Sequence, residues 1–368
     1  MLGKVRKVLV VGQVPPPYHG QAISTERFLS GKYKNAQLFH TKIQLSETMQ
    51  EVGKFKLIKL LRIFSSLLRV VADKFRYGCD TLYYMPSGGQ RVSLYKDFIL
   101  LIPSRWLFRQ TIFHFRSAGL AQCYQHLTLL EKGLFRLAYY HPKISITLSR
   151  LNPPDGEFIK SKLNVVIPNG IEDNCDPTKK LPSDHGKITF LYIGSIRQTK
   201  GVVDLIDAGK QLNSSFAGRF NIILAGRFHD LAFKEYVNSQ VAALDFLNYE
   251  GEVIGEAKWE LFYRSHVLVF PTYYENESFG LVNIEAAQFA MPVIATDWRA
   301  NRDLIEDGKT GFIIPVKSPG SIAEKMRQLI EDPKSIDRLG KSARDKYLKG
   351  YTLEDFYKNF DDLFKSIS

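Results

Sequence analysis

The chain has 368 residues, more than one hydrophobic core usually supports, so its length predicts two domains. Hydrophobic residues make up 45% of it, which excludes a disordered protein, and the longest apolar runs are too short to cross a bilayer. Cys79, Cys123 and Cys175 are few and widely spaced, so they favour a reducing, cytoplasmic compartment over a disulfide framework or a zinc site.

The charge is divided unequally along the chain. Residues 1–180 carry 27 Lys and Arg against 12 Asp and Glu, whereas residues 181–368 carry 23 against 26. The first half is therefore expected to have an anionic partner, and nucleic acid, an anionic phospholipid surface or a phosphorylated acceptor all fit this charge.

The first half alternates predicted strands and helices. Apolar runs predict strands over residues 7–11, 81–85, 111–115 and 144–149, and helical spacing predicts helices over 21–29, 54–76 and 95–102. Gly12 and Gln13 follow the apolar run of residues 1–11, and no small-residue cleavage site is evident, so we expect this run to form the first strand and not a signal peptide. Such an alternation indicates a doubly wound parallel sheet.

Residues 54–76 form the clearest amphipathic helix. Its apolar residues at helical spacing are Leu57, Leu60, Leu61, Phe64, Leu68, Val71 and Phe75, and Lys59, Arg62, Ser66, Arg69 and Asp73 fill the other face. The first interpretation is a helix that covers a sheet and leaves its basic face in water. The second is contact with an anionic membrane surface, which the positive charge of this half favours.

Polar residues follow two of the predicted strands. Gly20 ends a proline-rich loop after the first strand, and Gln21 begins the helix that follows. His114 lies near the end of the strand over 111–115, and Arg116 follows it. A single histidine is more often structural than catalytic. However, ligands of open α/β sheets bind at the carboxyl ends of strands, which favours a site role for these residues.

The second half begins after a polar segment, 173–187, whose composition is typical of a linker. A strand over 188–193 and a helix over 202–212 flank a loop that contains Arg197 and Lys200. The two cations at a strand end suit a diphosphate, with Lys as a point charge and Arg as a fork.

The most informative stretch is residues 267–316. An apolar run over 267–270 predicts a buried strand, a helix is predicted from Leu281 to before Pro292, and 293–295 begin the next strand. In such a βαβ unit the amides at the helix N-terminus point to a crevice beside the strand ends. This arrangement favours phosphate.

Two carboxylates, Glu277 and Glu285, flank the start of that helix with seven residues between them. Carboxylates near a phosphate repel the ligand unless they hold neutral donors such as sugar hydroxyls. The pattern therefore indicates a ligand that combines a diphosphate with a sugar. The alternative is a surface helix with an acidic first turn, which the helix dipole alone favours.

The run from Glu277 to Glu285, with Pro292-Val-Ile-Ala after it, resembles the Glu-x7-Glu signature of the retaining glycosyltransferases of family 4, which have the GT-B fold. The resemblance covers nearly the whole chain, most strongly from 187 to 316. Lys200 with Gly201 also matches the family pattern, as does the segment Pro168-Asn-Gly-Ile-Glu, with Glu replacing the more usual Asp.

The resemblance implies roles for individual residues. Glu285 would hold the ribose of the donor, Glu277 would contact the donor sugar, His114 would lie near that sugar, and Lys200 would meet the diphosphate. The other donor-side positions are Ser278, Phe279, Gly280, Leu281, Val282, Gly194, Gly226, Arg227 and Val253, and the positions on the acceptor or sugar side are Gly20, Gln21 and Arg116.

One residue departs from the family pattern. The family commonly has an arginine directly after the glycine that ends the first strand of this half, where this chain has Ser195. We expect Arg197 to take its place at the diphosphate.

The predicted fold is GT-B, with two Rossmann-like doubly wound parallel-sheet domains that face a central cleft. The expected parts are an acceptor-side domain (1–172), a linker (173–187), a nucleotide-sugar-binding domain (188–348) and a C-terminal helix (349–368) that can pack back on the first domain.

The predicted function is transfer of a sugar, with retention, from a nucleotide-diphosphate-sugar to an acceptor hydroxyl. UDP-sugars are the first choice of donor and GDP-sugars the second, and the acceptor would be a glycan or a lipid-linked molecule in bacterial envelope, exopolysaccharide or glycolipid assembly. No Asp-x-Asp triplet occurs, so we expect no required metal or other cofactor. The protein would be cytoplasmic, with peripheral contact to the inner face of the plasma membrane as a further expectation.

Two alternatives stay open at this point. One is a GT-B enzyme of another outcome, either a nucleotide-sugar epimerase or an inverting transferase. The other is a nucleic-acid-binding protein that uses the basic half, but such a protein needs no Glu-x7-Glu site, and we expect no nucleic-acid partner.

Overall fold

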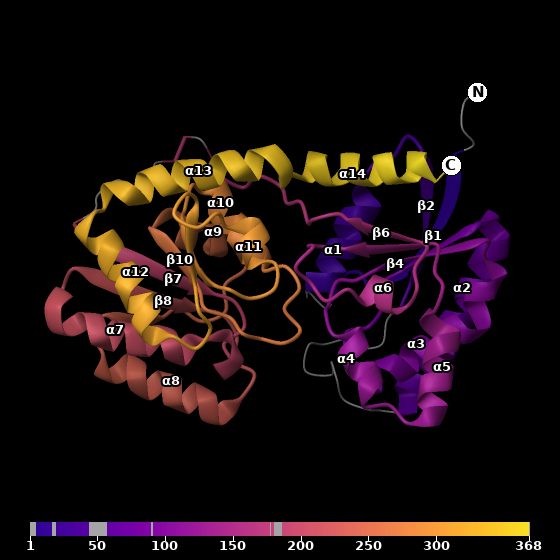
Figure 1. Ribbon diagram of the computed structural model, residues 1–368, viewed down its shortest axis with the longest axis horizontal. Helices are drawn as coiled ribbons and strands as arrows, with labels where there is room; N and C mark the ends of the chain where they lie inside the picture. The colour runs from indigo at the N-terminus through magenta and orange to yellow at the C-terminus, as the bar shows by residue number, and fades with distance from the viewer. Residues whose placement is uncertain are drawn as a thin grey trace. The chain divides into compact units, whose positions relative to one another are not determined.

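The computed structural model describes residues 5–16, 20–43, 57–89, 91–176, 178–179 and 186–367. The chain divides into two compact units, Met1–Asn169 with Glu354–Ser368, and Gly170–Leu353. Each unit contains a six-stranded sheet whose neighbouring strands are all parallel (Figure 1). The predicted fold of two doubly wound parallel sheets is confirmed.

The first unit has the strand order β2-β1-β3-β4-β5-β6. Its strands are β1 (Arg6–Gly12), β2 (Ala36–Lys42), β3 (Thr81–Tyr84), β4 (Gln110–His114), β5 (Ile144–Thr147) and β6 (Leu163–Val166). Its helices are α1 (Gly20–Ser30), α2 (Leu57–Tyr77), α3 (Arg91–Ser104), α4 (Leu120–Gln125), α5 (Leu129–Tyr139), α6 (Asp155–Phe158) and α14 (Leu353–Ser366), with a 3-10 turn, η2 (Arg105–Leu107). All four residues of β3 are buried, as expected for an inner strand that is covered on both faces.

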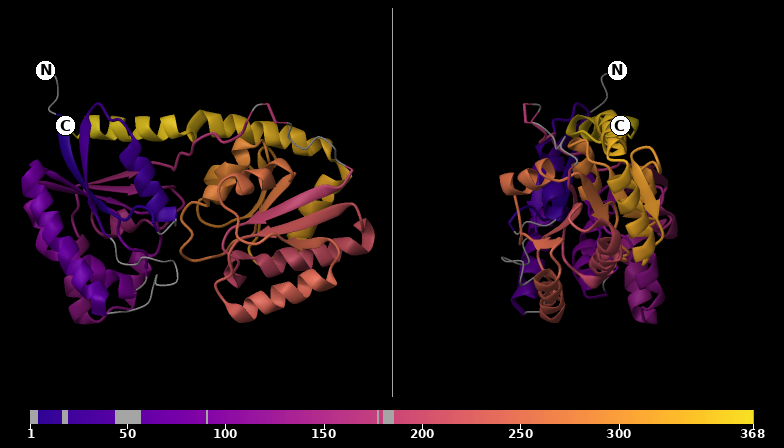
Figure 2. Two further views of the ribbon diagram at one scale, coloured as in Figure 1. Left: turned by 180° about the vertical axis from the view of Figure 1, so that it is seen from behind. Right: turned by 90° about the vertical axis from the view of Figure 1, so that its left-hand side faces the viewer.

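Helix α14 at the end of the chain belongs to the first unit. The ring of Phe360 lies 4.6 Å from that of Phe28 on α1, and the hydroxyl of Tyr357 donates to the carbonyl of Arg27 at 3.0 Å. Asp361 accepts a hydrogen bond from the amide of Asn35 at 2.9 Å. The views of the chain show this helix beside α1 (Figure 2). Aromatic packing thus ties the last helix to the first.

Helix α2 forms as predicted, but the apolar stripe that the first interpretation turned toward the sheet is exposed instead. Ile63, Ser66 and Val70 are buried, whereas Leu61, Phe64, Leu68 and Phe75 are 67%, 53%, 70% and 65% exposed. The sheet accepts Ser66 because its hydroxyl is satisfied by the carbonyl of Arg62 at 2.8 Å. The side chains of Leu57 and Leu60 lie outside the described residues. The most regular apolar stripe of this helix therefore faces away from the core.

The second unit has the strand order β12-β11-β10-β7-β8-β9. Its strands are β7 (Ile188–Ile193), β8 (Phe220–Ala225), β9 (Leu247–Tyr249), β10 (Val267–Phe270), β11 (Val293–Thr296) and β12 (Gly311–Ile314). A 3-10 turn, η3 (Gln198–Lys200), precedes the helices α7 (Val202–Phe216), α8 (Leu231–Ala243), α9 (Glu256–Tyr263), α10 (Leu281–Gln288), α11 (Asn301–Leu304), α12 (Pro319–Glu331) and α13 (Lys334–Gly350). One cluster of buried apolar side chains fills the space between this sheet, α7 and α12.

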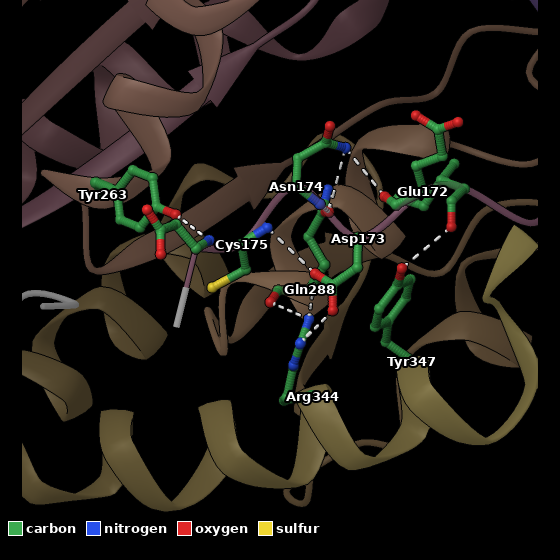
Figure 3. Close-up of polar contacts among 10 residues, drawn as sticks. Glu172, Asp173, Asn174, Cys175, Tyr263, Gln288, Arg344 and Tyr347 are labelled. Carbon is green, nitrogen blue, oxygen red and sulfur yellow. Dashed lines mark hydrogen bonds and ion pairs between the residues drawn. The ribbon is translucent and has the colours of Figure 1, made fainter. Parts of the chain in front are cut away.

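The segment before β7 is held on the second unit at its beginning (Figure 3). Arg344 of α13 donates to both carboxylate oxygens of Asp173, and the amide of Asn174 donates to Gln288 at 2.7 Å. The amide of Asp176 donates to the hydroxyl of Tyr263. The predicted linker over 173–187 thus starts with residues that are bonded to α10 and α13, and its residues 177 and 180–185 lie outside the described part.

Among the helices in the described part of the chain, none combines the length and the apolar character that crossing a bilayer requires.

Candidate active site

The topology of the second unit defines where a ligand would bind. The order of its strands reverses between β7 and β10, and ligands of doubly wound sheets occupy the crevice beyond the carboxyl ends of such a pair. The loops after β7 and β10 touch at this point. Gly201 has a φ of 75°, and a Cβ on it would lie 2.1 Å from the carbonyl oxygen of Pro271. Only glycine lets the two loops approach this closely.

The loop after β7 brings its two cations to the loop after β10. The ammonium of Lys200 forms an ion pair with Glu277, and each of these side chains is 14% exposed. Lys200 also lies 5.1 Å from the ring centre of Tyr274, and the guanidinium of Arg197 lies 5.3 Å from the same ring. Tyr274 thus holds both cations by its face. The Nε of Arg197 is buried and has no hydrogen-bond partner among the described residues.

The loop after β10 is fixed by side chains that follow β11. The indole N–H of Trp298 donates to the carbonyl of Tyr274 at 2.9 Å, and Arg299 donates to the carbonyl of Glu275 at 3.1 Å. The amide of Glu277 closes a turn on the carbonyl of Tyr274 at 3.0 Å. The carboxylate of Glu277 is therefore carried on a rigid loop.

Helix α10 begins at the same place. Its N-cap, Gly280, has a φ of 71°, and a Cβ there would lie 2.9 Å from the ring of Phe270. The predicted donor-side run passes from the fixed loop into the first turn of the helix; its members are Ser278, Phe279, Gly280, Leu281 and Val282. Phe279 is buried and anchors this run. The first amides of a helix have no partner within it, and they attract an anion.

Glu285 lies one turn further along α10. Its Oε1 is 2.6 Å from the ammonium of Lys258 on α9, and the two side chains are 12% and 23% exposed. Lys258 also lies over its neighbour Trp259, whose ring stacks on Phe289. Both carboxylates of the motif are thus paired with a lysine, each on a different element.

Two further glycines bring the loops after β7 and β8 together. Gly226 has a φ of 141°, and a Cβ on it would lie 1.7 Å from the carbonyl oxygen of Gly194. The amide of Gly226 donates to the carbonyl of Gly251 at 2.7 Å, and this bond fixes the turn that precedes Val253. The predicted positions Gly194, Gly226, Arg227 and Val253 therefore all follow the carboxyl ends of β7, β8 and β9.

His229 follows this loop and was not predicted. Burial and the positive charges of Arg197 and Arg227 lower the pKa of His229. His229 is therefore neutral at neutral pH. The arginines that lower its pKa also make this region of the second unit positive, and a positive region attracts an anionic ligand.

His114 lies in the first unit, at the end of β4, and no part of it is exposed. Its Nδ1 contacts the hydroxyl of Tyr83, its ring lies 5.7 Å from that of Phe360 on α14, and its Nε2 has no partner among the described residues. Burial, and then the charge of Arg116, holds the pKa of His114 well below 6.5. A contact between His114 and a sugar would require the side chains around it to move.

The other predicted residues of the first unit surround the ends of β1 and β4. Arg116 donates to the side chain of Asn169, and burial lowers the pKa of Arg116 to about 10. Gly20 begins α1, where a Cβ would meet no atom within 4 Å, and the carbonyl of Gln21 accepts a hydrogen bond from Thr25. The strand order of this unit reverses between β1 and β3. Gly20 and Gln21 come after β1 in the chain, so they follow one of the two strands that form this switch point. Residues 17–19 of the preceding loop lie outside the described part.

The burial of His114 predicts a pH effect on stability. Its pKa is lower in the folded chain than the ordinary 6.5, so the unfolded chain binds the extra proton and stability is lost as the pH falls below 6.5. One such group costs about 1.4 kcal/mol when the pH is about one unit below its unfolded pKa. Thermal unfolding of wild type and His114→Gln over this pH range checks it, and the exposed His126→Gln is the control. Equal pH dependence of all three proteins would contradict the expectation.

In the described residues, no group of three or more His, Cys, Asp and Glu side chains is arranged to hold a metal ion. The charges at the switch point of the second unit come from Lys200, Arg197, Glu277, Lys258 and Glu285. They suit a ligand that carries a diphosphate and several hydroxyl groups.

Two doubly wound units, each built on a parallel sheet, are the architecture of the GT-B fold, so the predicted fold is confirmed. Over residues 176–346 the chain matches the family described as Glycosyl transferases group 1. This match lies within the second unit.

Two curated relatives and one solved structure illustrate the likeness. The chain is 27% identical over 164 residues to D-rhamnosyltransferase WbpZ of Pseudomonas aeruginosa, covering 44% of this chain and 41% of the relative. It is 25% identical over 209 residues to O-antigen chain mannosyltransferase C of Escherichia coli, covering 55% and 54%. The chain thus spans about half the length of these relatives. The structure of Anabaena Alr3699/HepE in complex with UDP matches 98% of this chain and 100% of its own, with a TM-score of 0.73 and 17% identity, so it shares the fold.

Proposed function

We propose that this protein transfers a sugar from a nucleotide-diphosphate-sugar to the hydroxyl of an acceptor, with retention of configuration at the anomeric carbon. The observation that carries the proposal is the set of charges at the switch point of the second unit. Lys200 pairs with Glu277 before α10 begins, Arg197 lies over Tyr274 of the same loop, and Glu285 follows on α10. The family match over residues 176–346 covers all of these residues.

In the proposed reaction the bond between the anomeric carbon and the diphosphate oxygen breaks, and the diphosphate leaves with the electron pair. Lys200, Arg197 and the first amides of α10 stabilise the charge that develops on it. Glu285 binds the ribose hydroxyls, and Glu277 orients the sugar once Lys200 turns to the diphosphate. The acceptor oxygen forms the new bond on the same face, and its proton passes to an oxygen of the leaving diphosphate. The configuration is thereby retained.

The donor and the setting are finer parts of the same proposal. A UDP-sugar is the first choice, since the fold is shared with a protein solved in complex with UDP, and a GDP-sugar is the second. An O-antigen chain mannosyltransferase among the relatives supports a glycan or lipid-linked acceptor in polysaccharide or glycolipid assembly. We place the enzyme in the cytoplasm, at the inner face of the plasma membrane. With two cations for the diphosphate, we expect donor binding without a metal ion.

The test is thermal stabilisation by UDP, GDP, ADP and their sugar conjugates, with a chelator present. A donor at 100 times its dissociation constant adds about 2.7 kcal/mol of stability to the form that binds it. We expect one nucleotide series to stabilise the wild type and to lose this effect in Glu285→Ala. Exposed Glu260→Ala on α9 is the matched control. No stabilisation by any compound of the panel, with or without added divalent metal, would contradict the proposal.

Retention is tested separately by assigning the anomeric configuration of donor and product by NMR. An inverted product would leave the donor site in place and overturn the same-face mechanism.

A further inference from the structure

The exposed stripe of α2 points directly away from the core. At about 100° per residue, Leu61, Phe64, Leu68 and Phe75 fall within an arc of about 60°, opposite the buried Ile63, Ser66 and Val70. The stripe runs for roughly 21 Å, at about 1.5 Å per residue. These four side chains are named the α2 apolar face. A water-facing helix normally carries polar groups at such positions, so this face needs a partner.

A row of arginines accompanies the α2 apolar face. Arg62, Arg69 and Arg76 recur at every seventh residue, so they lie one above another along one flank of the stripe. Asp73 is the one acidic residue of α2, and its carboxylate accepts a hydrogen bond from Thr41 at 2.7 Å. The outward side of the helix therefore combines apolar and positive groups and presents no exposed carboxylate.

The neighbouring helices continue this character. Helix α3 packs against α2 and against α5, and Figure 1 shows α3 and α5 next to each other. At their N-terminal ends Val92, Leu129 and Leu130 are 63%, 89% and 76% exposed. The acidic residues of these two helices are turned inward. Glu131 is 5% exposed and bonded to Arg91, and Asp97 is fully buried. These helix ends thus add exposed apolar side chains to the first unit, and neither α3 nor α5 adds an exposed carboxylate.

We propose that the α2 apolar face docks the first unit on an anionic lipid surface, with α2 lying in the plane of the interface. Leu and Phe side chains enter the boundary of the acyl chains, and the arginine row meets the phosphates of the headgroups. A second copy of this chain fits less well, because two arginine rows would face each other. Nucleic acid would gain nothing from the leucines. This inference deepens the proposed function, on which it rests for its setting.

Flotation of the full-length protein with lipid vesicles tests the inference. We expect the wild type to float with vesicles of phosphatidylcholine and phosphatidylglycerol, and not with phosphatidylcholine alone. Phe64→Gln/Leu68→Gln, which keeps helix propensity and charge, should lower partitioning at least about tenfold. Arg69→Gln/Arg76→Gln should weaken binding chiefly at low salt. Leu231→Gln/Tyr236→Gln, a pair on α8 of the second unit that is 79% and 36% exposed, is the matched control and should not change it.

Three outcomes would overturn the inference. The first is a wild type that does not bind the vesicles, and the second is a Phe64→Gln/Leu68→Gln variant that floats like the wild type. The third is a wild-type dimer that this double variant converts to a monomer. The same preparations are tested for stabilisation by the nucleotide panel. A wild type that is stabilised by a nucleotide but does not bind vesicles contradicts the membrane inference alone. A wild type that binds vesicles but is not stabilised by any nucleotide contradicts the proposed transfer alone.

Discussion

Replacing Lys200 with Met is expected to lower kcat by roughly 100- to 1,000-fold, the usual effect of removing one preorganised donor from a developing negative charge. The ammonium of Lys200 is held between Glu277 and the face of Tyr274, so it is already beside the donor site and needs only to turn from Glu277 to the diphosphate. Its contribution should be largest when the diphosphate leaves. Steady-state kinetics with the donor identified by the stabilisation panel measures the effect.

The matched control for this variant is Lys210→Met. Lys210 is on α7 and pairs with Asp207 at 3.2 Å, where both side chains are 41% exposed. Such a surface pair contributes little, so the kinetics of this control should be unchanged. If Lys200→Met raised KM and left kcat intact, Lys200 would bind the donor equally in the ground and transition states, and its proposed role would be wrong.

Glu285→Gln is expected to act on binding. In the proposed reaction the ribose does not react, so the hydrogen bonds proposed between it and Glu285 are equal in the ground and transition states. Their loss should raise KM with little change in kcat. Hydrogen bonds to a charged group contribute about 1.5 to 3 kcal/mol, which corresponds to a rise in KM of roughly 10- to 150-fold. The measurement is the kinetic constants of the variant at saturating acceptor.

Glu260→Gln is the control for Glu285→Gln, since Glu260 is 56% exposed on α9, the helix that also carries Lys258. Its KM should equal that of the wild type. A fall in kcat with no change in KM for Glu285→Gln would place Glu285 at the reacting atoms instead of at the ribose.

The strands of the second unit could be predicted closely from the sequence. β7 and β10 are buried runs because both faces of the sheet are covered, and their bounds match the predictions. β2 was not predicted, since its sequence AQLFHTK is partly polar and the strand lies at the edge of its sheet. Strand prediction worked where burial is complete and failed where it is partial.

Helix α2 shows a limit of periodicity. Its sequence has apolar residues on two sides, Ile63 and Val70 on one, Leu61 and Leu68 on the other. The longer stripe was assigned to the core, but the sheet receives the shorter one together with Ser66. Spacing identifies a helix, while the choice of its buried side depends on the elements that surround it.

Some residues of the candidate site could be predicted from the sequence, and others could be found only from the structure. Lys200, Glu277 and Glu285 belong to motifs at fixed spacing, so the sequence could point to them. Lys258 and Tyr274 could not be found in this way, because their roles come from contacts between separate elements. Lys258 reaches Glu285 from α9, and Tyr274 meets Arg197 from the loop after β10.

The two lysine–glutamate pairs have a consequence for selectivity. Each glutamate serves as an internal counterion for its lysine, so Lys200 and Lys258 do not offer bare positive charge to the phosphates of the cell. A simple phosphate or pyrophosphate that drew Lys200 away would leave Glu277 without compensation beside an anion, which is costly. A sugar diphosphate brings hydroxyl groups for the carboxylate as well as oxygens for the ammonium. We therefore expect the site to discriminate against partial ligands, because they would leave the charge of Glu277 unpaired.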